Sequence, residues 1–133
     1  MSVSAAVDRL SAAFAARDVA AALACFVSGD HIGYAGSELD ESATGPPAVT
    51  ALLTALFARD EAYSWTTRTT FVHVYGSSAY LFAEVDALVT TDAGELIPFP
   101  YRISGLAEVV GGNWLWRHCQ GCEPTTGDGV SAG

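Results

Sequence analysis

The chain has 133 residues, half of them hydrophobic, and a formal net charge of −9 at pH 7. This charge argues against nucleic acid or an anionic membrane as a partner, because binding to phosphates needs clustered cations. Every basic residue is an arginine, so lysine Schiff-base chemistry and a P-loop lysine are excluded.

Three helices are predicted in the first half of the chain. The first ends near Arg17 and has an apolar stripe at helical spacing, formed by Val3, Val7, Leu10 and Phe14. Asp18 is expected to cap a second helix, which stops near residue 28. The third helix begins at Pro46, a residue suited to a first turn, and ends near residue 58.

The remaining segments are predicted to form strands. Residues 31–35 are expected to be a short strand, followed by a polar loop over residues 36–43. The stretch from Trp65 to Pro124 predicts four long strands, because β-branched and aromatic residues recur with period two. Glycine-containing turns divide these strands at residues 75–78, 92–95 and 111–113. The strands should therefore form an antiparallel sheet that is covered on one face by the helices.

Two of these strands contain candidate functional side chains. Arg102 lies in the middle of its strand, where it could pair with Glu84 or Asp86, remain exposed, or bind an anion on a pocket floor. In the last strand, period two predicts one face formed by Trp114, Trp116, His118 and Gln120. A pocket bounded by such residues would suit a small aromatic or aliphatic acid.

At the level of motifs the chain resembles the SnoaL-like branch of the NTF2-like superfamily over residues 3–124. The resemblance is carried by Gly33-Tyr34-Ala35-Gly36-Ser37-Glu38, Tyr63-Ser64-Trp65, Pro100-Tyr101-Arg102-Ile103-Ser104-Gly105 and the ending Trp116-Arg117-His118-Cys119-Gln120-Gly121-Cys122-Glu123-Pro124. It implies an α+β cone, in which three helices pack on a strongly curved, mainly antiparallel sheet and leave a pocket. It also implies a homodimer that pairs through the sheet.

The same resemblance suggests site residues. The arginine strand is similar to that of the association domain of calmodulin-dependent kinase II, which implies that Arg102 points into the cavity. His118 and Gln120 would then be pocket residues, and Trp116, Tyr34 and Trp65 would line the cavity. The residues of ketosteroid isomerases are not matched, since no carboxylate stands at residues 33–35 and no hydroxyl near Leu10.

Three functional hypotheses follow from the sequence. The favoured one is a pocket that binds a small anionic or aromatic metabolite, with Arg102, His118 and Gln120 as anchors. The second is an isomerase, cyclase or dehydratase acting on a small carbonyl or polyketide-like substrate, with His118 as the acid-base group. The third is a dimerisation module with a vestigial pocket.

Cofactors, domain limits and location complete the expectations. Neither a metal nor a cofactor is expected, because Cys119, Cys122 and His118 supply at most three zinc ligands. No apolar run is long enough for a bilayer, and the N-terminus lacks the pattern of a secretory signal. We therefore expect a cytoplasmic protein with one domain over residues 1–124 and a flexible tail over residues 125–133.

Overall fold

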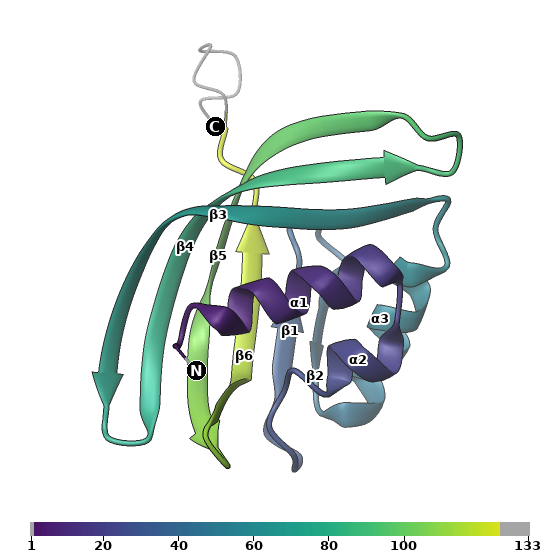
Figure 1. The fold of residues 1–133 in the computed structure, drawn as a ribbon. Helices are drawn as coiled ribbons and strands as arrows, with labels where there is room; N and C mark the ends of the chain where they lie inside the picture. The colour runs from purple at the N-terminus through teal and green to yellow at the C-terminus, as the bar shows by residue number, and fades with distance from the viewer. Residues whose placement is uncertain (1, 126–133) are drawn as a thin grey trace.

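A computed structural model describes residues 2–125 of the chain, and its helices precede its long strands as predicted (Figure 1). The elements are α1 (Ala5–Ala16), α2 (Val19–Leu23), β1 (Gly33–Ala35), β2 (Ser42–Thr44), α3 (Pro46–Phe57), β3 (Glu61–Tyr75), β4 (Ser78–Thr91), β5 (Leu96–Val110) and β6 (Asn113–Cys122). The predicted tail, apart from residue 125, lies outside the described residues. No helix within residues 2–125 is long and apolar enough to cross a membrane.

The helices follow the sequence pattern except at the end of α2. The apolar stripe of α1 is buried, and the Asp18 carboxylate caps α2 by accepting a hydrogen bond from the Ala21 amide at 3.0 Å. The prediction that α2 continues to residue 28 is wrong. The chain leaves the helix after Leu23 because the backbone of Cys25 and Val27 hydrogen-bonds to that of Trp116 in β6. Tertiary pairing therefore overrides the local helical pattern.

One six-stranded sheet has the order β2-β1-β6-β5-β4-β3. The long strands β3 to β6 are antiparallel neighbours, as predicted, whereas β1 runs parallel to β6. Three strand limits differ from the prediction: β1 begins at Gly33, β3 begins at Glu61, and the polar loop contains β2. The short strands β1 and β2 pair with each other, and β1 also pairs with β6, whereas the added start of β3 pairs with the end of β4. Period two within one segment does not show such pairing.

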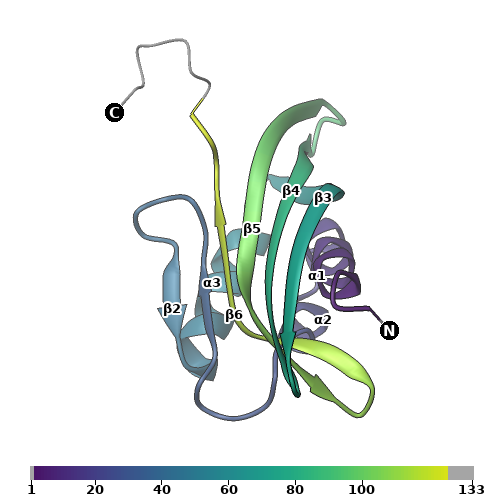
Figure 2. The ribbon, with the colours of Figure 1, turned by 90° about the vertical axis from the view of Figure 1, so that its left-hand side faces the viewer.

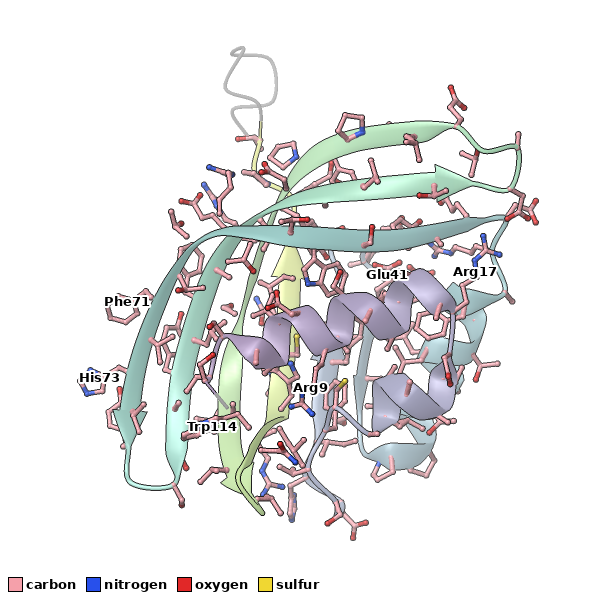
Figure 3. The ribbon with its side chains drawn as sticks, in the orientation of Figure 1. Arg9, Arg17, Glu41, Phe71, His73 and Trp114 are labelled. Atoms are coloured by element: carbon pink, nitrogen blue, oxygen red, sulfur yellow. The ribbon has the colours of Figure 1, made fainter. Side chains whose placement is uncertain are left out.

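The sheet is strongly curved, and the three helices cover its concave inner face (Figures 1 and 2). In Figure 1 the upper ends of β3, β4 and β5 extend over α1 and α3. Register shifts between Thr67 and Thr69, and between Leu106 and Ala107, mark β-bulges, which bend strands locally. Arg17 at the end of α1 donates to Asp92 at 2.7 Å and so ties the β4–β5 turn to the helix (Figure 3).

Two tryptophans fix α1 against the inner face. The Trp116 indole nitrogen donates to the Ala6 carbonyl at 3.2 Å, and the Trp65 indole nitrogen donates to the Val7 carbonyl at 3.0 Å. The Ser11 hydroxyl adds hydrogen bonds to the Trp65 backbone, at 2.8 Å from its amide and 2.9 Å to its carbonyl. Since β6 and β3 supply the two indoles, α1 is held at two separated strands, and this sets the width of the cone.

Candidate ligand-binding cavity

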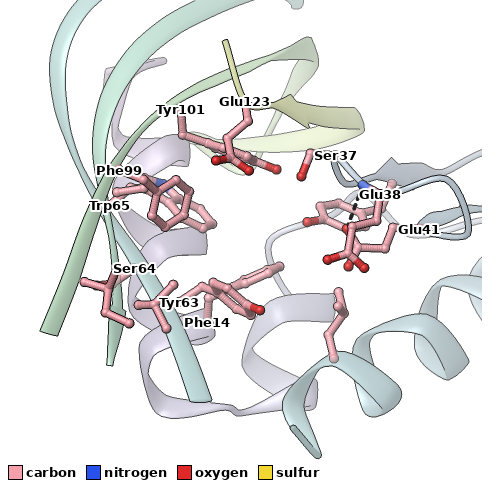
Figure 4. A pocket seen from close by; sticks show the side chains of 15 residues that line it. Phe14, Ser37, Glu38, Glu41, Tyr63, Ser64, Trp65, Phe99, Tyr101 and Glu123 are labelled. Carbon is pink, nitrogen blue, oxygen red and sulfur yellow. Dashed lines mark hydrogen bonds between the residues drawn. The ribbon is translucent and has the colours of Figure 1, made fainter. Parts of the chain in front are cut away.

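A cavity of about 300 Å³ lies where the ends of β3, β4 and β5 extend over the helices (Figure 4). It is bounded by the sheet on one side and by α1, α3 and the β1–β2 loop on the other. Its lining residues are Phe14, Tyr34, Ser37, Glu38, Glu41, Leu56, Tyr63, Ser64, Trp65, Ala87, Val89, Ile97, Phe99, Tyr101 and Glu123. A volume of this size suits a small molecule.

Aromatic rings form one side of the cavity. Phe14 of α1 packs against Trp65 of β3 with ring centroids 5.1 Å apart, and against Tyr34 of β1 at 5.9 Å. On β5, Phe99 and Tyr101 meet edge to face at 5.8 Å. Figure 4 shows Trp65 and Phe99 together at one side of the open space. Such rings offer apolar contact area and π faces to a ligand.

Three carboxylates line the rest of the cavity. Glu38 and Glu41 lie across the open space from Trp65 and Phe99, and Glu123 lies beside Tyr101 (Figure 4). Glu38 and Glu41 lie in or beside the β1–β2 connection, and Glu123 directly follows β6. The Arg59 guanidinium lies 3.2 Å from a Glu41 carboxylate oxygen and 3.4 Å from one of Glu38. Glu41 is buried, so this arginine compensates part of its desolvation. No cation is among the lining residues.

Two glycines make room for the polar walls. A Cβ atom at Gly36 would lie 2.3 Å from a Glu41 carboxylate oxygen, and one at Gly121 would lie 2.3 Å from the Tyr101 hydroxyl. Any side chain at either position would therefore displace the wall residue that lies over it. These glycines explain physically why the motifs around residues 33–38 and 116–124 matter for the cavity.

Burial keeps the phenols of the cavity protonated. It raises the pKa of Tyr34 and of Tyr101, and the nearby Glu41 charge acts in the same direction. The Ser37 side chain has the opposite, smaller effect on the pKa of Tyr101. Burial also raises the pKa of Tyr63, whose hydroxyl donates to Glu61 at 2.5 Å. Neutral phenols can donate hydrogen bonds to a ligand at any physiological pH.

The predicted site residues divide into two groups. Tyr34 and Trp65 line the cavity, and the structure brings them together through Phe14. Trp116 is fully buried in the core and does not line it. Arg102 lies on the outer face, with its Nε 3.7 Å from a Glu84 carboxylate oxygen, and so takes the ion-pair alternative rather than the pocket floor.

The predicted face of β6 is wrong from His118 onward. Leu106 pairs with His118, but Ala107 pairs with Trp116, so Arg117 is an extra residue in a β-bulge. Period two therefore changes phase, and His118 and Gln120 are exposed whereas Trp116 and Cys119 are buried. Gly105 permits this close approach, since a Cβ there would lie 1.9 Å from the His118 carbonyl oxygen.

His118 instead borders an outer depression beside the start of β1. Its ring lies against Gly33, where a Cβ atom would be 2.6 Å from the imidazole Cδ2. His31, Asp30 and Arg117 share the rim of this depression. Arg117 is already engaged by Glu108, at 2.8 and 2.9 Å, and by the His31 carbonyl at 2.9 Å. No cluster in residues 2–125 has three or more side chains placed to hold a metal ion.

Sequence reasoning missed most of the polar lining. Glu38 and Glu41 lie in the predicted polar loop, and Glu123 lies at the end of the predicted last strand. Their convergence depends on the β1–β2 pairing and on β6 passing beside it. One signal was present for Phe99 and Tyr101. They alternate with Pro98 and Pro100, whose side chains lie on the outer face with Leu88 and Asp86, so the aromatic residues face inward.

A curved sheet wrapped over three helices, with a cavity at the overhanging strand ends, defines an α+β cone of the NTF2-like type. The family model described as "SnoaL-like domain" matches residues 3–124. The chain belongs to the SnoaL-like branch of the NTF2-like superfamily. No match was found among curated proteins.

Solved structures with the same fold share little sequence with this chain. A proposed dehydratase of the NTF2-like family from Streptomyces avermitilis has a TM-score of 0.78 at 12% identity, covering 92% of this chain and 94% of that one. An NTF2-like superfamily protein from Salmonella enterica has a TM-score of 0.78 at 15% identity, with 98% and 94% covered. A proposed scytalone dehydratase from Novosphingobium aromaticivorans has a TM-score of 0.76 at 14% identity, with 92% and 82% covered. These similarities show the fold.

Proposed function

We propose that the protein binds a small, mainly aromatic molecule in the cavity beneath β3, β4 and β5. The observation that supports this most is an open space of about 300 Å³ bordered by aromatic rings, with neutral phenols available as hydrogen-bond donors. The vestigial-pocket hypothesis required large side chains to fill this space. Phe99, one candidate for that filling, instead forms its wall.

The anionic ligand expected from the sequence is disfavoured. Its anchors, Arg102, His118 and Gln120, are exposed residues that do not line the cavity. The carboxylates of Glu38 and Glu41 that do line it would repel an anion. The aromatic half of the expectation is retained, because Trp65 and Phe99 offer ring faces on the inner wall.

Filling the cavity tests this proposal. Ala87 is buried on the inner face of β4 and lines the cavity, so an Ala87→Phe ring would occupy ligand space. We expect neutral aromatic compounds such as 2-phenylethanol to raise the unfolding temperature of the wild type but not of Ala87→Phe. Ala93→Phe makes the same substitution in the exposed β4–β5 turn and should retain the effect. Equal stabilisation of all three proteins would contradict a cavity site.

We further propose a homodimer formed through the outer face of the sheet. Phe71 is 58% exposed and Tyr75 59% exposed, and Tyr80 and Leu106 lie on the same face. Phe71 and Tyr80 rings are 6.4 Å apart, and Figure 3 shows Phe71 and His73 pointing away from the helices. A second copy of the chain would cover this apolar group by two-fold symmetry.

The dimer is testable by sedimentation. The wild type should sediment as a dimer at micromolar concentration, and Phe71→Asp should sediment as a monomer with an unchanged far-UV spectrum. Leu39→Asp is the matched control, because Leu39 is also an exposed apolar residue but lies in the β1–β2 loop, away from this face. A monomeric wild type would rule out the dimer and leave the cavity proposal intact.

A second candidate function is proton-transfer chemistry in the same cavity, such as loss of water from a β-hydroxy carbonyl compound. The observation in its favour is a buried carboxylate, Glu41, beside the neutral phenols Tyr34 and Tyr101. The Glu41 carboxylate can accept the α-proton while the phenols stabilise the developing enolate oxygen. The resulting carboxylic acid can then return this proton to the departing β-hydroxyl group, which leaves as water. Two structurally similar proteins are proposed dehydratases. His118 is replaced in this role because it lies on the other face.

Glu41→Gln distinguishes catalysis from binding. It keeps the shape of the side chain and removes the base, so turnover of a β-hydroxy ketone should be lost while binding of the neutral compound is retained. Glu95→Gln, in the exposed turn before β5, is the charge-matched control. Absence of turnover by the wild type over a panel of such compounds would contradict the catalytic function, and only the binding function would remain.

A further inference from the structure

The charge distribution of the cavity is one-sided. Glu38, Glu41 and Glu123 line the space, whereas Arg59 lies outside the lining and contacts Glu38, Glu41 and the Tyr63 hydroxyl. Glu123 forms no ion pair within residues 2–125. Three carboxylates and one guanidinium leave a net negative charge at the cavity. Glu41 is buried, where charges interact more strongly than in water, whereas Glu38 and Glu123 are exposed.

A buried phenol adds a second, independent feature that points to a ligand. Tyr34 is only 7% exposed and lines the cavity, yet its hydroxyl has no hydrogen-bond partner among the described residues. Among the described residues, the side-chain atoms that are fully buried without a partner are Arg9 Nε and Thr67 Oγ1, so the Tyr34 hydroxyl is accessible from the cavity. A ligand group or an ordered water can therefore bond to it there. A phenol oxygen can accept a hydrogen bond as well as donate one.

The aromatic side of the cavity suits the same chemistry. Trp65 and Phe99 form the side of the cavity that faces the carboxylates of Glu38 and Glu41 across the open space (Figure 4). Aromatic faces attract organic cations through the ring quadrupole, and tryptophan does so most strongly. An ammonium group could therefore lie between ring faces and carboxylates, with its apolar body against β5.

We infer that the cavity selects a small aromatic amine in its protonated, cationic form. This inference rests on the proposed binding function and specifies the charge of its ligand. The ammonium group would lie toward Glu123 and Glu41, within reach of the Tyr34 hydroxyl, and the ring would lie against Trp65 and Phe99. The charge is opposite to that expected from the sequence, because the predicted arginine anchor faces outward.

Three compounds with the same aromatic body test the charge preference: 2-phenylethylamine, 2-phenylethanol and phenylacetate at pH 7. Dissociation constants would be measured by titration at low and at physiological salt. We expect the amine to bind about tenfold more tightly than the alcohol, the carboxylate to bind most weakly, and the preference for the amine to shrink with salt.

Glu123→Gln supplies the matched variant, because it removes one negative charge while keeping size and shape. It should reduce amine affinity several-fold more than alcohol affinity, and Glu95→Gln in the exposed turn should change neither. Equal affinities of wild type for amine and alcohol, or no effect of Glu123→Gln, would overturn the inference and leave the binding function standing. Failure of all three compounds to bind would overturn both.

Discussion

The two faces of the same four strands differ in chemistry. On the inner face, β4 and β5 present small and aromatic residues such as Ala87, Phe99 and Tyr101, which form either core or cavity. On the outer face they present Glu84 and Arg102, which pair with each other across the strands. On β5, the cavity residue Tyr101 and the outer-face residue Arg102 are neighbours in sequence and point to opposite faces.

This difference shows that the phase of each strand decides which residues can form a site. Where the alternation is uninterrupted, as in β4, one phase stays on the inner face, and Ala83, Val85 and Ala87 are all buried. In β6 the bulge at Arg117 reverses the phase between Trp116 and His118. A single inserted residue therefore places two predicted binding residues, His118 and Gln120, on the outer surface instead of in the cavity.

The largest predicted effect on stability comes from a substitution in the part of the inner face that packs in the core. Trp116 is fully buried and hydrogen-bonded to α1, so Trp116→Ala should lower the free energy of unfolding by about 3–5 kcal/mol. Denaturant unfolding measures this change. Phe71→Ala on the outer face is the comparison variant. It should lower the free energy of unfolding of the monomer by less than about 1 kcal/mol. Equal losses would mean that the two faces do not differ as described.

A smaller loss is expected at the glycine beneath Tyr101. Gly121→Ala places a methyl group against the Tyr101 ring and should cost about 1–3 kcal/mol and weaken ligand binding. Unfolding and ligand titration are measured together. In a Tyr101→Ala background the same substitution should cost much less, because the clash is gone. An undiminished cost in that background would show that the clash is not the cause.

Stability at high pH should report the buried phenols. Burial raises the pKa of Tyr34 and Tyr101 in the folded state, so the unfolded chain loses these protons first, near pH 10. Their contribution to stability is complete below that pH and falls above it, by up to about 1.4 kcal/mol per pH unit for each phenol. Tyr34→Phe should lessen the decline measured between pH 10 and 11.5. An unchanged slope would contradict the buried state of this hydroxyl.

The smallest effects are predicted for the outer-face residues that the sequence favoured. His118→Ala and Arg102→Ala should leave ligand affinity unchanged, because neither side chain lines the cavity. Loss of the exposed Arg102–Glu84 pair should cost less than about 0.5 kcal/mol. Isothermal titration with 2-phenylethanol checks the affinities. A tenfold loss of ligand affinity in either variant would show that the substituted residue contacts the ligand, as the sequence predicted.

Local patterns predicted much of this fold. The stripe ending at Phe14, the Asp18 cap, Pro46 in a first turn and the hairpin turns all depend on neighbouring residues, and all are present. The early end of α2 depends on backbone hydrogen bonds to β6. The presence of β2 depends on its pairing with β1, which itself pairs with β6, so neither was predicted.

The site was harder to predict than the fold. Tyr34 and Trp65 were identified because they lie in motifs of the family, whereas Glu41 and Glu123 are separated by more than half the chain and meet only after the sheet has formed. Charge in the cavity is therefore a tertiary property. The arginine on β5 was a reasonable candidate in sequence, but its strand phase places it on the outer face.

The most direct test of a ligand cavity uses the indole N–H resonances of the three tryptophans. Trp65 lines the cavity and Trp116 lies in the core. Trp114 lies at the start of β6, the end of the strand that is farther along the chain from the cavity residue Glu123. Titration with 2-phenylethanol should shift the Trp65 resonance, assigned through Trp65→Phe, and leave that of Trp116 nearly unchanged. Saturating addition without movement of the Trp65 resonance, or with movement of Trp114 alone, would contradict binding in this cavity.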